Sequence, residues 1–306
     1  MSPIEQLVAE ELAIPADPRV TEMAVAIAAR YPNAARSVLF YGSCLRESQL
    51  EGLMLDFYLI VSDYDAAYGD GWLARANRLI PPNVFPFEHR GLIAKYAVLS
   101  EADFHNLNCA TASAVSVWAR FAQPARLVWA ADDAARKTAV EAISEASITL
   151  FQLTLPLMPA DTDFDPIAVW REGFALTYSA ELRAERKDRS DSIVDTYLAR
   201  YERFSQPVLA EIAERMGVGP NGEVPNLLSR KAGMRRWSAL RRRSKLLTVA
   251  RLAKAAFTYA GGIDYLAWKI NRHAGTQIEI KPWQRKWPLV AALVLVPKLL
   301  AKGAVR

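Results

Sequence analysis

Short apolar runs of β-favouring residues occur within the first 131 of the 306 residues and then stop, which limits the possible folds more than any other feature. Residues 37–41, 53–61, 91–99 and 125–129 predict four buried strands, because turn-forming residues flank these runs. Helical periodicity fills most of the remaining chain. The sequence therefore predicts an α+β fold with a small mixed sheet in its first half.

The chain divides into three predicted parts. They are an α/β domain over residues 1–131, a helical domain over 132–226 and a basic helical tail over 227–306. The composition, 52% hydrophobic and 23% charged, is that of an ordered chain. Helical periodicity covers residues 3–31 with a break at 15–18, 63–80, 101–121, 132–155, 166–180, 192–216 and 234–273.

Charge is distributed unevenly along the chain, although the formal net charge is only +5. Residues 230–306 hold 18 Lys and Arg against two acidic residues, whereas residues 1–229 hold 20 against 31. An acidic body with a basic tail predicts an anionic partner, either a nucleic acid or a membrane surface.

The apolar run at residues 287–297 favours the membrane, because a nucleic-acid-binding tail has no use for it. The run is shorter than the roughly 20 residues of a spanning helix, which leaves a buried segment or an interfacial anchor. We predict peripheral binding to an anionic bilayer and argue against nucleic acid as the partner. The predicted membrane-binding residues are Arg241, Arg242, Arg243, Lys245, Trp283, Lys286 and Trp287.

The N-terminal residues and the two cysteines indicate where the protein works. Glu5, Glu10 and Glu11 make the start of the chain acidic, with no targeting pattern. Cys44 and Cys109 do not make a disulfide framework, which favours a reducing compartment. We expect a cytoplasmic protein that associates peripherally with the inner face of a membrane.

A Gly-Ser pair directly after the first predicted strand is followed, after twelve intervening residues, by an acid inside the next strand. These residues are Gly42, Ser43 and Asp56. The pattern is typical of nucleotidyltransferases of the polymerase β type, in which Gly-Ser opens a helix that holds nucleotide phosphates and the carboxylate holds Mg²⁺. A second acid usually lies two positions beyond the first, where this chain has Tyr58. The alternative is an ordinary turn and a strand-end aspartate.

Five blocks of the sequence extend this pattern: residues 41–43, 54–57, 95–96, 123–128 and 173–183. In this order they resemble the mitochondrial type of phosphatidate cytidylyltransferase, also called CDP-diacylglycerol synthase, over about residues 37–205. That family also has a basic C-terminus near the membrane and an apolar residue at the second-acid position. Residues 69–90 and the N-terminus, which shows no presequence, depart from the family.

The resemblance implies that CTP and phosphatidate react to give CDP-diacylglycerol and pyrophosphate, with Mg²⁺ as the cofactor. It implies that Asp56 binds the metal. A phosphate acceptor is anionic at neutral pH, so a second carboxylate is not needed as a base, and Lys95 is suited to offset the repulsion between the two anions. The predicted catalytic residues are Asp56 and Lys95, and the predicted nucleotide-binding residues are Gly42, Ser43, Arg46, Tyr178, Ser179 and Arg183.

The residues leave two other functions open. A nucleotidyltransferase of the same fold could act on RNA, on a protein or on a different lipid phosphate. A catalytically silent member could bind lipid as a scaffold, and the single acid on the strand is the chief argument for it. For Lys95 and Arg46 the alternative role is a solvated or salt-bridged surface charge, and for the block 173–183 it is interdomain packing.

Overall fold

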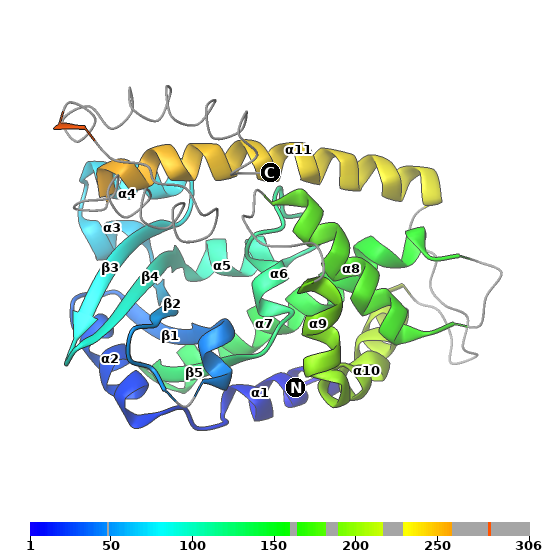
Figure 1. Ribbon diagram of the computed structural model, residues 1–306, viewed down its shortest axis with the longest axis horizontal. Helices are drawn as coiled ribbons and strands as arrows, with labels where there is room; N and C mark the ends of the chain where they lie inside the picture. The colour runs from blue at the N-terminus through cyan, green and yellow to red at the C-terminus, as the bar shows by residue number, and fades with distance from the viewer. Residues whose placement is uncertain (48, 160–163, 182–188, 217–228, 259–280, 283–306) are drawn as a thin grey trace.

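Within the residues that the computed structural model describes, five strands form one mixed sheet (Figure 1). The described residues are 1–47, 49–159, 164–181, 189–216, 229–258 and 281–282. The strands are β1 (Ala35–Tyr41), β2 (Met54–Val61), β3 (Asn83–His89), β4 (Leu92–Ser100) and β5 (Ala125–Ala130).

The strand order across the sheet is β3-β4-β2-β1-β5. The central strands β2 and β4 are parallel, and the other neighbouring pairs are antiparallel. Four of the strands confirm the predicted ones, and the sheet with its many helices confirms the α+β class. The sequence pattern does not predict β3, because this segment carries Pro86 and does not alternate cleanly. An edge strand tolerates proline, since one of its sides has no partner strand.

The helices follow the predicted segments, with three of the longer ones divided. Residues 63–80 form α3 and α4, residues 101–121 form α5 and α6, and residues 192–216 contribute to α9 and α10. The helix bounds are α1 (Pro3–Leu12), α2 (Pro18–Ala28), α3 (Tyr64–Tyr68), α4 (Trp72–Leu79), α5 (Glu101–Asn108), α6 (Trp118–Phe121), α7 (Asp133–Thr154), α8 (Pro166–Ala180), α9 (Arg189–Thr196), α10 (Leu198–Met216) and α11 (Arg230–Thr258).

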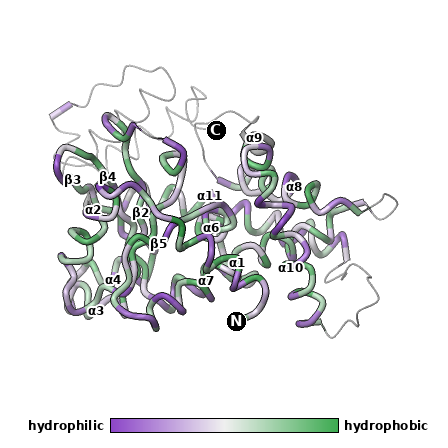
Figure 2. The backbone as a smooth tube through the Cα atoms, turned by 90° about the horizontal axis from the view of Figure 1, so that it is seen from below, coloured by the Kyte–Doolittle hydropathy of each residue, from purple (hydrophilic) through white to green (hydrophobic). Residues whose placement is uncertain are grey.

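The two faces of the sheet belong to two different cores. Along β2, Phe57 and Leu59 pack in one core with residues of α2, whereas Tyr58 and Ile60 pack in the other with residues of α1, α7 and α8. Figure 2 shows α1, α7 and α10 next to one another, and these helices are in mutual contact. The second core runs from the sheet through the helical half without a break at residue 131. The predicted domain boundaries therefore remain predictions.

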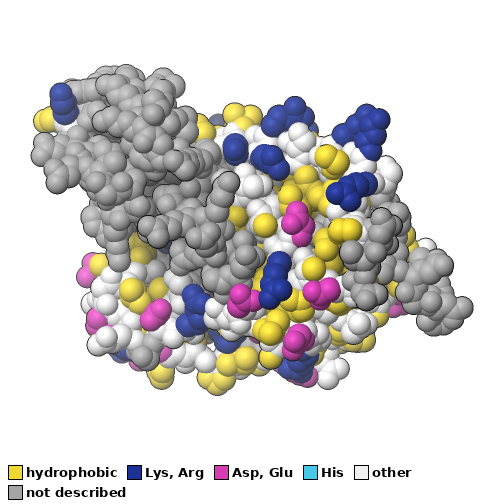
Figure 3. All heavy atoms as spheres, turned by 45° about the vertical axis from the view of Figure 1, so that its right-hand side comes forward, with side chains coloured by type: hydrophobic (Ala, Val, Ile, Leu, Met, Phe, Trp, Pro, Cys, Tyr) yellow, Lys and Arg dark blue, Asp and Glu magenta, His cyan; other side chains and the backbone are white. Residues whose placement is uncertain are grey.

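Helix α11 runs along one side of the molecule, from the helical half to the sheet edge at β3 (Figure 1). Its inner side is fixed by the buried residues Trp237, Leu240 and Ser244. Figure 3 shows Lys and Arg side chains gathered along the edge where α11 lies. Four predicted membrane-binding residues are exposed on this helix, namely Arg241, Arg242, Arg243 and Lys245.

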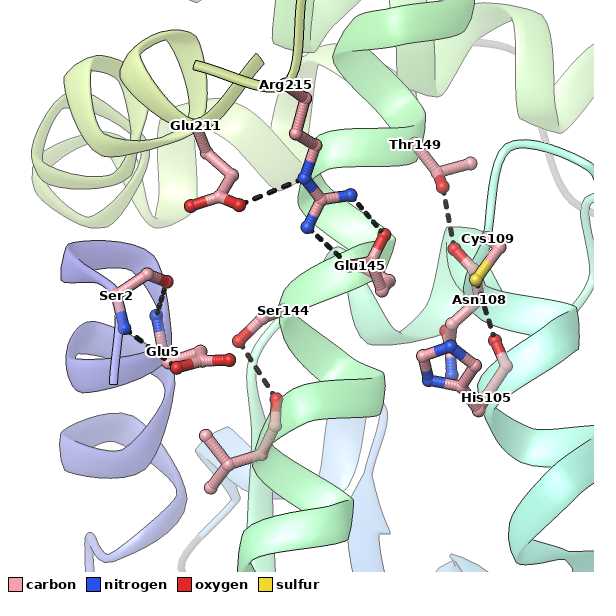
Figure 4. Close-up of polar contacts among 11 residues, drawn as sticks. Ser2, Glu5, His105, Asn108, Cys109, Ser144, Glu145, Thr149, Glu211 and Arg215 are labelled. Atoms are coloured by element: carbon pink, nitrogen blue, oxygen red, sulfur yellow. Dashed lines mark hydrogen bonds and ion pairs between the residues drawn. The ribbon is translucent and has the colours of Figure 1, made fainter. Parts of the chain in front are cut away.

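Helix α7 is held to its neighbours by polar contacts on two sides (Figure 4). Arg215 of α10 donates hydrogen bonds of 2.9 and 2.6 Å to the two carboxylate oxygens of Glu145 on α7, and one of 2.9 Å to Glu211. On the other side, the Thr149 hydroxyl donates to the carbonyl of Asn108 at 2.7 Å. These contacts fix the helix that underlies β1 and β5.

Candidate functional site

Three strands bring Tyr41, Asp56 and Lys95 into one lateral row. Tyr41 is the register partner of Asp56 across β1 and β2, and Asp56 is the partner of Lys95 across β2 and β4. Directly opposite residues share a face of the sheet, and this row lies on the face that carries Tyr58. The Nζ atom of Lys95 is 2.7 Å from Oδ1 of Asp56, and both side chains are 25% exposed. The two predicted catalytic residues therefore touch, and solvent reaches them.

The predicted Gly-Ser turn lies beside this carboxylate. Gly42 has a φ of +95°, which residues with a side chain rarely adopt. A Cβ atom at this position would lie 3.5 Å from Oδ2 of Asp56, so the turn approaches the carboxylate closely. The predicted helix is a single 3₁₀ turn, Ser43–Arg46, whose first residue is exposed.

Arg46, the last residue of this turn, points toward the helical half. Its guanidinium carbon lies 5.8 Å from the ring centroid of Tyr197, just before α10. Among the described residues it makes no ion pair or hydrogen bond with the Asp56 row. Its predicted role at the nucleotide remains a prediction.

Tyr58 occupies the position at which nucleotidyltransferases of the polymerase β type carry a second acid, and its ring forms an aromatic wall on this face of the sheet. The side chain is buried, with its ring centroid 5.3 Å from Tyr41 and 5.2 Å from Phe121. Burial raises the pKa of its phenol, so Tyr58 is neutral at physiological pH. The strand thus presents one carboxylate and, beyond it, an aromatic surface.

An ion pair that the sequence pattern does not single out lies beside this wall. Arg120 on α6 and Glu181, directly after α8, are 3.5 Å apart, and their side chains are 31% and 8% exposed. Loss of hydration disfavours the charged form of Arg120. The negative groups around it, with Glu181 foremost and Asp56 among them, nevertheless raise its pKa above the ordinary value. Glu181 lies inside the block 173–183, so the sequence did contain a signal for it.

Helix α11 brings two more cations to the same region. Arg251 donates from Nη1 to the Ser116 hydroxyl and from Nε to the carbonyl of Pro81, both at 2.7 Å. Lys254 donates to the carbonyls of Ile80 and Pro82, the latter at 2.8 Å. Burial lowers the pKa of Arg251 below its ordinary value, and burial with the nearby Arg251 lowers the pKa of Lys254 to about 7. Sequence alone could not show that these residues reach the sheet.

Of the remaining predicted residues, the structure describes only Tyr178, Ser179 and the basic residues of α11. Tyr178 is partly exposed on α8, and the exposed Ser179 donates its hydroxyl hydrogen to the Leu176 carbonyl of its own helix at 2.7 Å. Arg183, Trp283, Lys286 and Trp287 lie outside the described residues. The predictions for these residues are neither supported nor opposed.

The donor set around Asp56 suits a metal ion that arrives with its substrate. Within the described part of the chain, no group of three or more His, Cys, Asp or Glu side chains could hold a metal by itself. Mg²⁺ is commonly held by one or two carboxylates together with substrate phosphates. A single, partly exposed carboxylate beside an open turn fits that mode of binding.

The region carries more positive than negative charge. Its described cations are Lys95, Arg120, Arg251 and Lys254, and its described carboxylates are Asp56 and Glu181. Such an excess favours anionic ligands.

Comparison of the chain with protein-family models and with curated protein sequences gives no match. No helix in the described ranges combines the length and the apolar character that crossing a membrane requires.

Proposed function

We propose that this protein is a Mg²⁺-dependent nucleotidyltransferase that transfers a cytidylyl group from CTP to the phosphate of phosphatidate at a membrane surface. The observation that carries this proposal is the row on the sheet, where one carboxylate contacts one ammonium group beside a glycine turn. The polymerase β-like fold, suggested by the spacing of Gly42, Ser43 and Asp56, is part of the proposal. The mixed sheet and the closeness of Gly42 to Asp56 support it.

The absence of a second acid on β2 supports an acceptor that is already charged. Hydroxyl acceptors need a base, whereas a phosphate monoester, with a second pKa of about 6, is largely a dianion at neutral pH. An oxygen of that phosphate attacks the α-phosphorus of CTP and forms a new P–O bond. The bond to the β-phosphate oxygen breaks, and pyrophosphate leaves with the electron pair. In this scheme Tyr58 takes no part in proton transfer.

The chain's own residues have two tasks in such a reaction. Asp56 would hold Mg²⁺ together with the nucleotide phosphates, and the metal would supply charge neutralisation at the α-phosphate. Lys95 would reduce the repulsion between the two anionic substrates. Because Lys95 contacts Asp56 in this structure, we expect its ammonium to turn toward phosphate oxygen when the carboxylate takes up a metal.

The test is a turnover assay with the full chain, labelled CTP, Mg²⁺ and phosphatidate in mixed micelles. Asp56→Asn should lower kcat by about a hundred- to a thousandfold, the scale expected when a group that stabilises the transition state is lost. Asp133→Asn, an exposed carboxylate in the first turn of α7, is the matched control and should leave kcat unchanged.

Three outcomes separate the functions. CDP-lipid that forms with Asp133→Asn but not with Asp56→Asn supports the proposal. CTP turnover only with another acceptor, such as RNA, a protein or a different lipid phosphate, would show the same chemistry on another substrate. Absence of turnover with every acceptor would favour a silent, lipid-binding protein and overturn the proposal.

The exposed basic side of α11, defined as Arg241, Arg242, Arg243 and Lys245, supports docking on an anionic bilayer. Each engaged basic residue contributes about 1 kcal/mol near such a surface at low salt. Replacing the three arginines by Gln should therefore weaken co-sedimentation with phosphatidylserine vesicles roughly a hundredfold. The control replaces three exposed arginines that are paired with carboxylates, Arg19, Arg90 and Arg203. Equal losses in the two triple variants would contradict specific docking through α11.

A further inference from the structure

Ser116 joins two arginines that come from distant parts of the chain. Arg120 on α6 donates to the backbone carbonyl of Ser116, and Arg251 on α11 donates to its side-chain hydroxyl at 2.7 Å. Ser116 itself is buried, at 8% exposed. The two guanidinium groups are therefore held side by side, although 131 positions separate them in the sequence.

Arg251 has no ion-pair partner within the described part of the chain. The oxygens that it contacts, those of Pro81 and Ser116, are neutral, and these two bonds use two of its five N–H groups. A largely buried cation is costly when no carboxylate contacts it; burial lowers the pKa of Arg251, and the charge of Glu181 opposes this only in smaller measure. Structural arginines are usually paired, so an arginine with unused donors and no ion pair among the described residues indicates an anionic ligand.

Arg120 has one ion-pair partner, Glu181, among the residues that the structure describes. Glu181 lies 3.5 Å from Nη1 and is itself buried, whereas 31% of the Arg120 side chain is exposed. The carboxylate thus orients the guanidinium from within the protein and leaves part of it in contact with solvent. Glu181 is a positioning residue in this arrangement.

The arginine pair lies near Tyr58, because the ring of Phe121, the residue after Arg120 on α6, is 5.2 Å from the Tyr58 ring. The Tyr58 ring lies on the same face of β2, two residues from Asp56, and a strand advances by about 7 Å over that interval. The positive charge of Arg120 and Arg251 acts on the Tyr58 phenol, as does the negative charge of Asp56. An anion between the arginines would therefore lie on the same side of the sheet as a group held at Asp56 and Lys95.

We infer that Arg120 and Arg251, joined through Ser116, form a subsite for the phosphate group of a phosphate monoester. Guanidinium groups match phosphate oxygens in a forked, two-bond geometry, which a single ammonium cannot do. Lys254 contacts the carbonyls of the adjacent turn of residues 80–82 and adds a third positive charge when its amine is protonated. The assignment of this phosphate to the acceptor lipid rests on the proposed function, whereas the existence of the subsite does not.

Direct binding of inorganic phosphate, measured by calorimetry without CTP or Mg²⁺, tests the subsite. Arg251→Gln should weaken the affinity for phosphate at least tenfold. Arg251→Lys keeps the charge but cannot form the two-bond guanidinium contact, so its affinity should lie between those of Arg251→Gln and the wild type. Arg235→Gln removes the same charge from an exposed position of the same helix and should leave the affinity unchanged. Failure of the wild type to bind phosphate, or equal losses in Arg251→Gln and Arg235→Gln, would overturn the inference.

Glu181→Gln provides a second variant in case Arg251→Gln does not fold. It should weaken phosphate binding several-fold, because Arg120 loses the carboxylate that orients it. Its melting temperature and that of Arg251→Gln show whether each variant is folded. Unchanged phosphate affinity in a folded Glu181→Gln protein would contradict the positioning role.

Competition binding experiments identify which molecule carries the phosphate group that binds at the subsite. Short-chain phosphatidate should displace inorganic phosphate, and the phosphatidylcholine of equal chain length should not. Displacement by glycerol 3-phosphate but not by phosphatidate would overturn the assignment to the lipid acceptor. These measurements contain no nucleotide, so absence of CTP turnover leaves them intact. Conversely, an active enzyme whose kcat/KM for phosphatidate is unaffected by Arg251→Gln would refute the assignment of the subsite to the lipid acceptor and leave the proposed function standing.

Discussion

Two ion pairs join distant segments of this chain, and they differ in how closely the protein surrounds them. Glu11 of α1 and Arg200 of α10 are only 10% and 9% exposed, and Arg200 donates to both carboxylate oxygens. Arg200 also bonds the Ala122 carbonyl at 3.0 Å and lies 4.2 Å from the ring centroid of Phe204. Asp56 and Lys95 are each 25% exposed, and one contact of 2.7 Å defines their ion pair.

The buried pair of Glu11 and Arg200 acts as a structural clamp between α1 and α10. The more exposed pair of Asp56 and Lys95 can open. Removal of the Glu11 carboxylate leaves the buried cation of Arg200 without its partner, whereas Lys95 can exchange its carboxylate for water or for a ligand. An active site needs the second kind of pair, because substrate must displace an existing contact. The exposed fractions of the two pairs thus predict a large loss of stability when the buried pair is broken and a small one when the exposed pair is broken.

Removal of the clamp should have the largest effect on folding. Glu11→Ala leaves Arg200 buried and unpaired, which should lower the free energy of unfolding by about 3–5 kcal/mol. Urea denaturation measures the change. The neighbouring Glu10, whose pair with Arg203 is exposed, gives the control, and Glu10→Ala should change stability by less than about 1 kcal/mol. Similar losses in the two variants would mean that burial does not distinguish the clamp.

Lys254 extends the comparison to a cation whose contacts are neutral. Its pKa is lowered to about 7 by burial and by nearby Arg251, whereas an unfolded chain has a lysine pKa of about 10.4. Between these values the unfolded state binds a proton that the folded state lacks, so stability rises with pH. Between pH 7 and pH 9 the wild type should gain about 2 kcal/mol relative to Lys254→Met. Parallel curves of unfolding free energy against pH for the two proteins would exclude this linkage.

The smallest effect on stability is expected at the proposed catalytic pair. Asp56→Asn and Lys95→Met should each change the free energy of unfolding by about 1 kcal/mol or less, because both side chains reach solvent. A double-mutant cycle with the two substitutions measures their coupling energy directly. A coupling above about 2 kcal/mol would make this pair a second clamp and remove the contrast with Glu11 and Arg200.

The fold was predictable where local pattern decides the structure. Continuous apolar runs predicted β1, β2 and β4, since strands buried on both faces leave little room for polar residues, and the short run of residues 125–129 predicted the edge strand β5. The edge strand β3 was not predicted, because Pro86 and the charged Glu88 are more typical of a loop than of a strand. Antiparallel pairing with β4 holds β3 in place. The sequence of residues 83–89 alone does not reveal this pairing.

The candidate site was predictable only in its sheet half. Asp56 and Lys95 lie on strands that the sequence predicts, and parallel pairing of those strands brings them together. Arg120 and Arg251 meet through Ser116, and the bond from Arg251 spans 135 positions. Lys254 reaches residue 80, 174 positions away. Such contacts depend on how α11 packs against the rest of the protein. The spacing of residues that are close in the sequence cannot predict them.

The path of α11 also sets an order of events during synthesis. A ribosome delivers Asp56 and Lys95 early, and every strand of the sheet has been made once residue 130 is translated. Arg251 and Lys254 come more than a hundred residues later. If Arg251 contributes to the site as inferred, the chain cannot bind its phosphate ligand during synthesis until α11 has been translated.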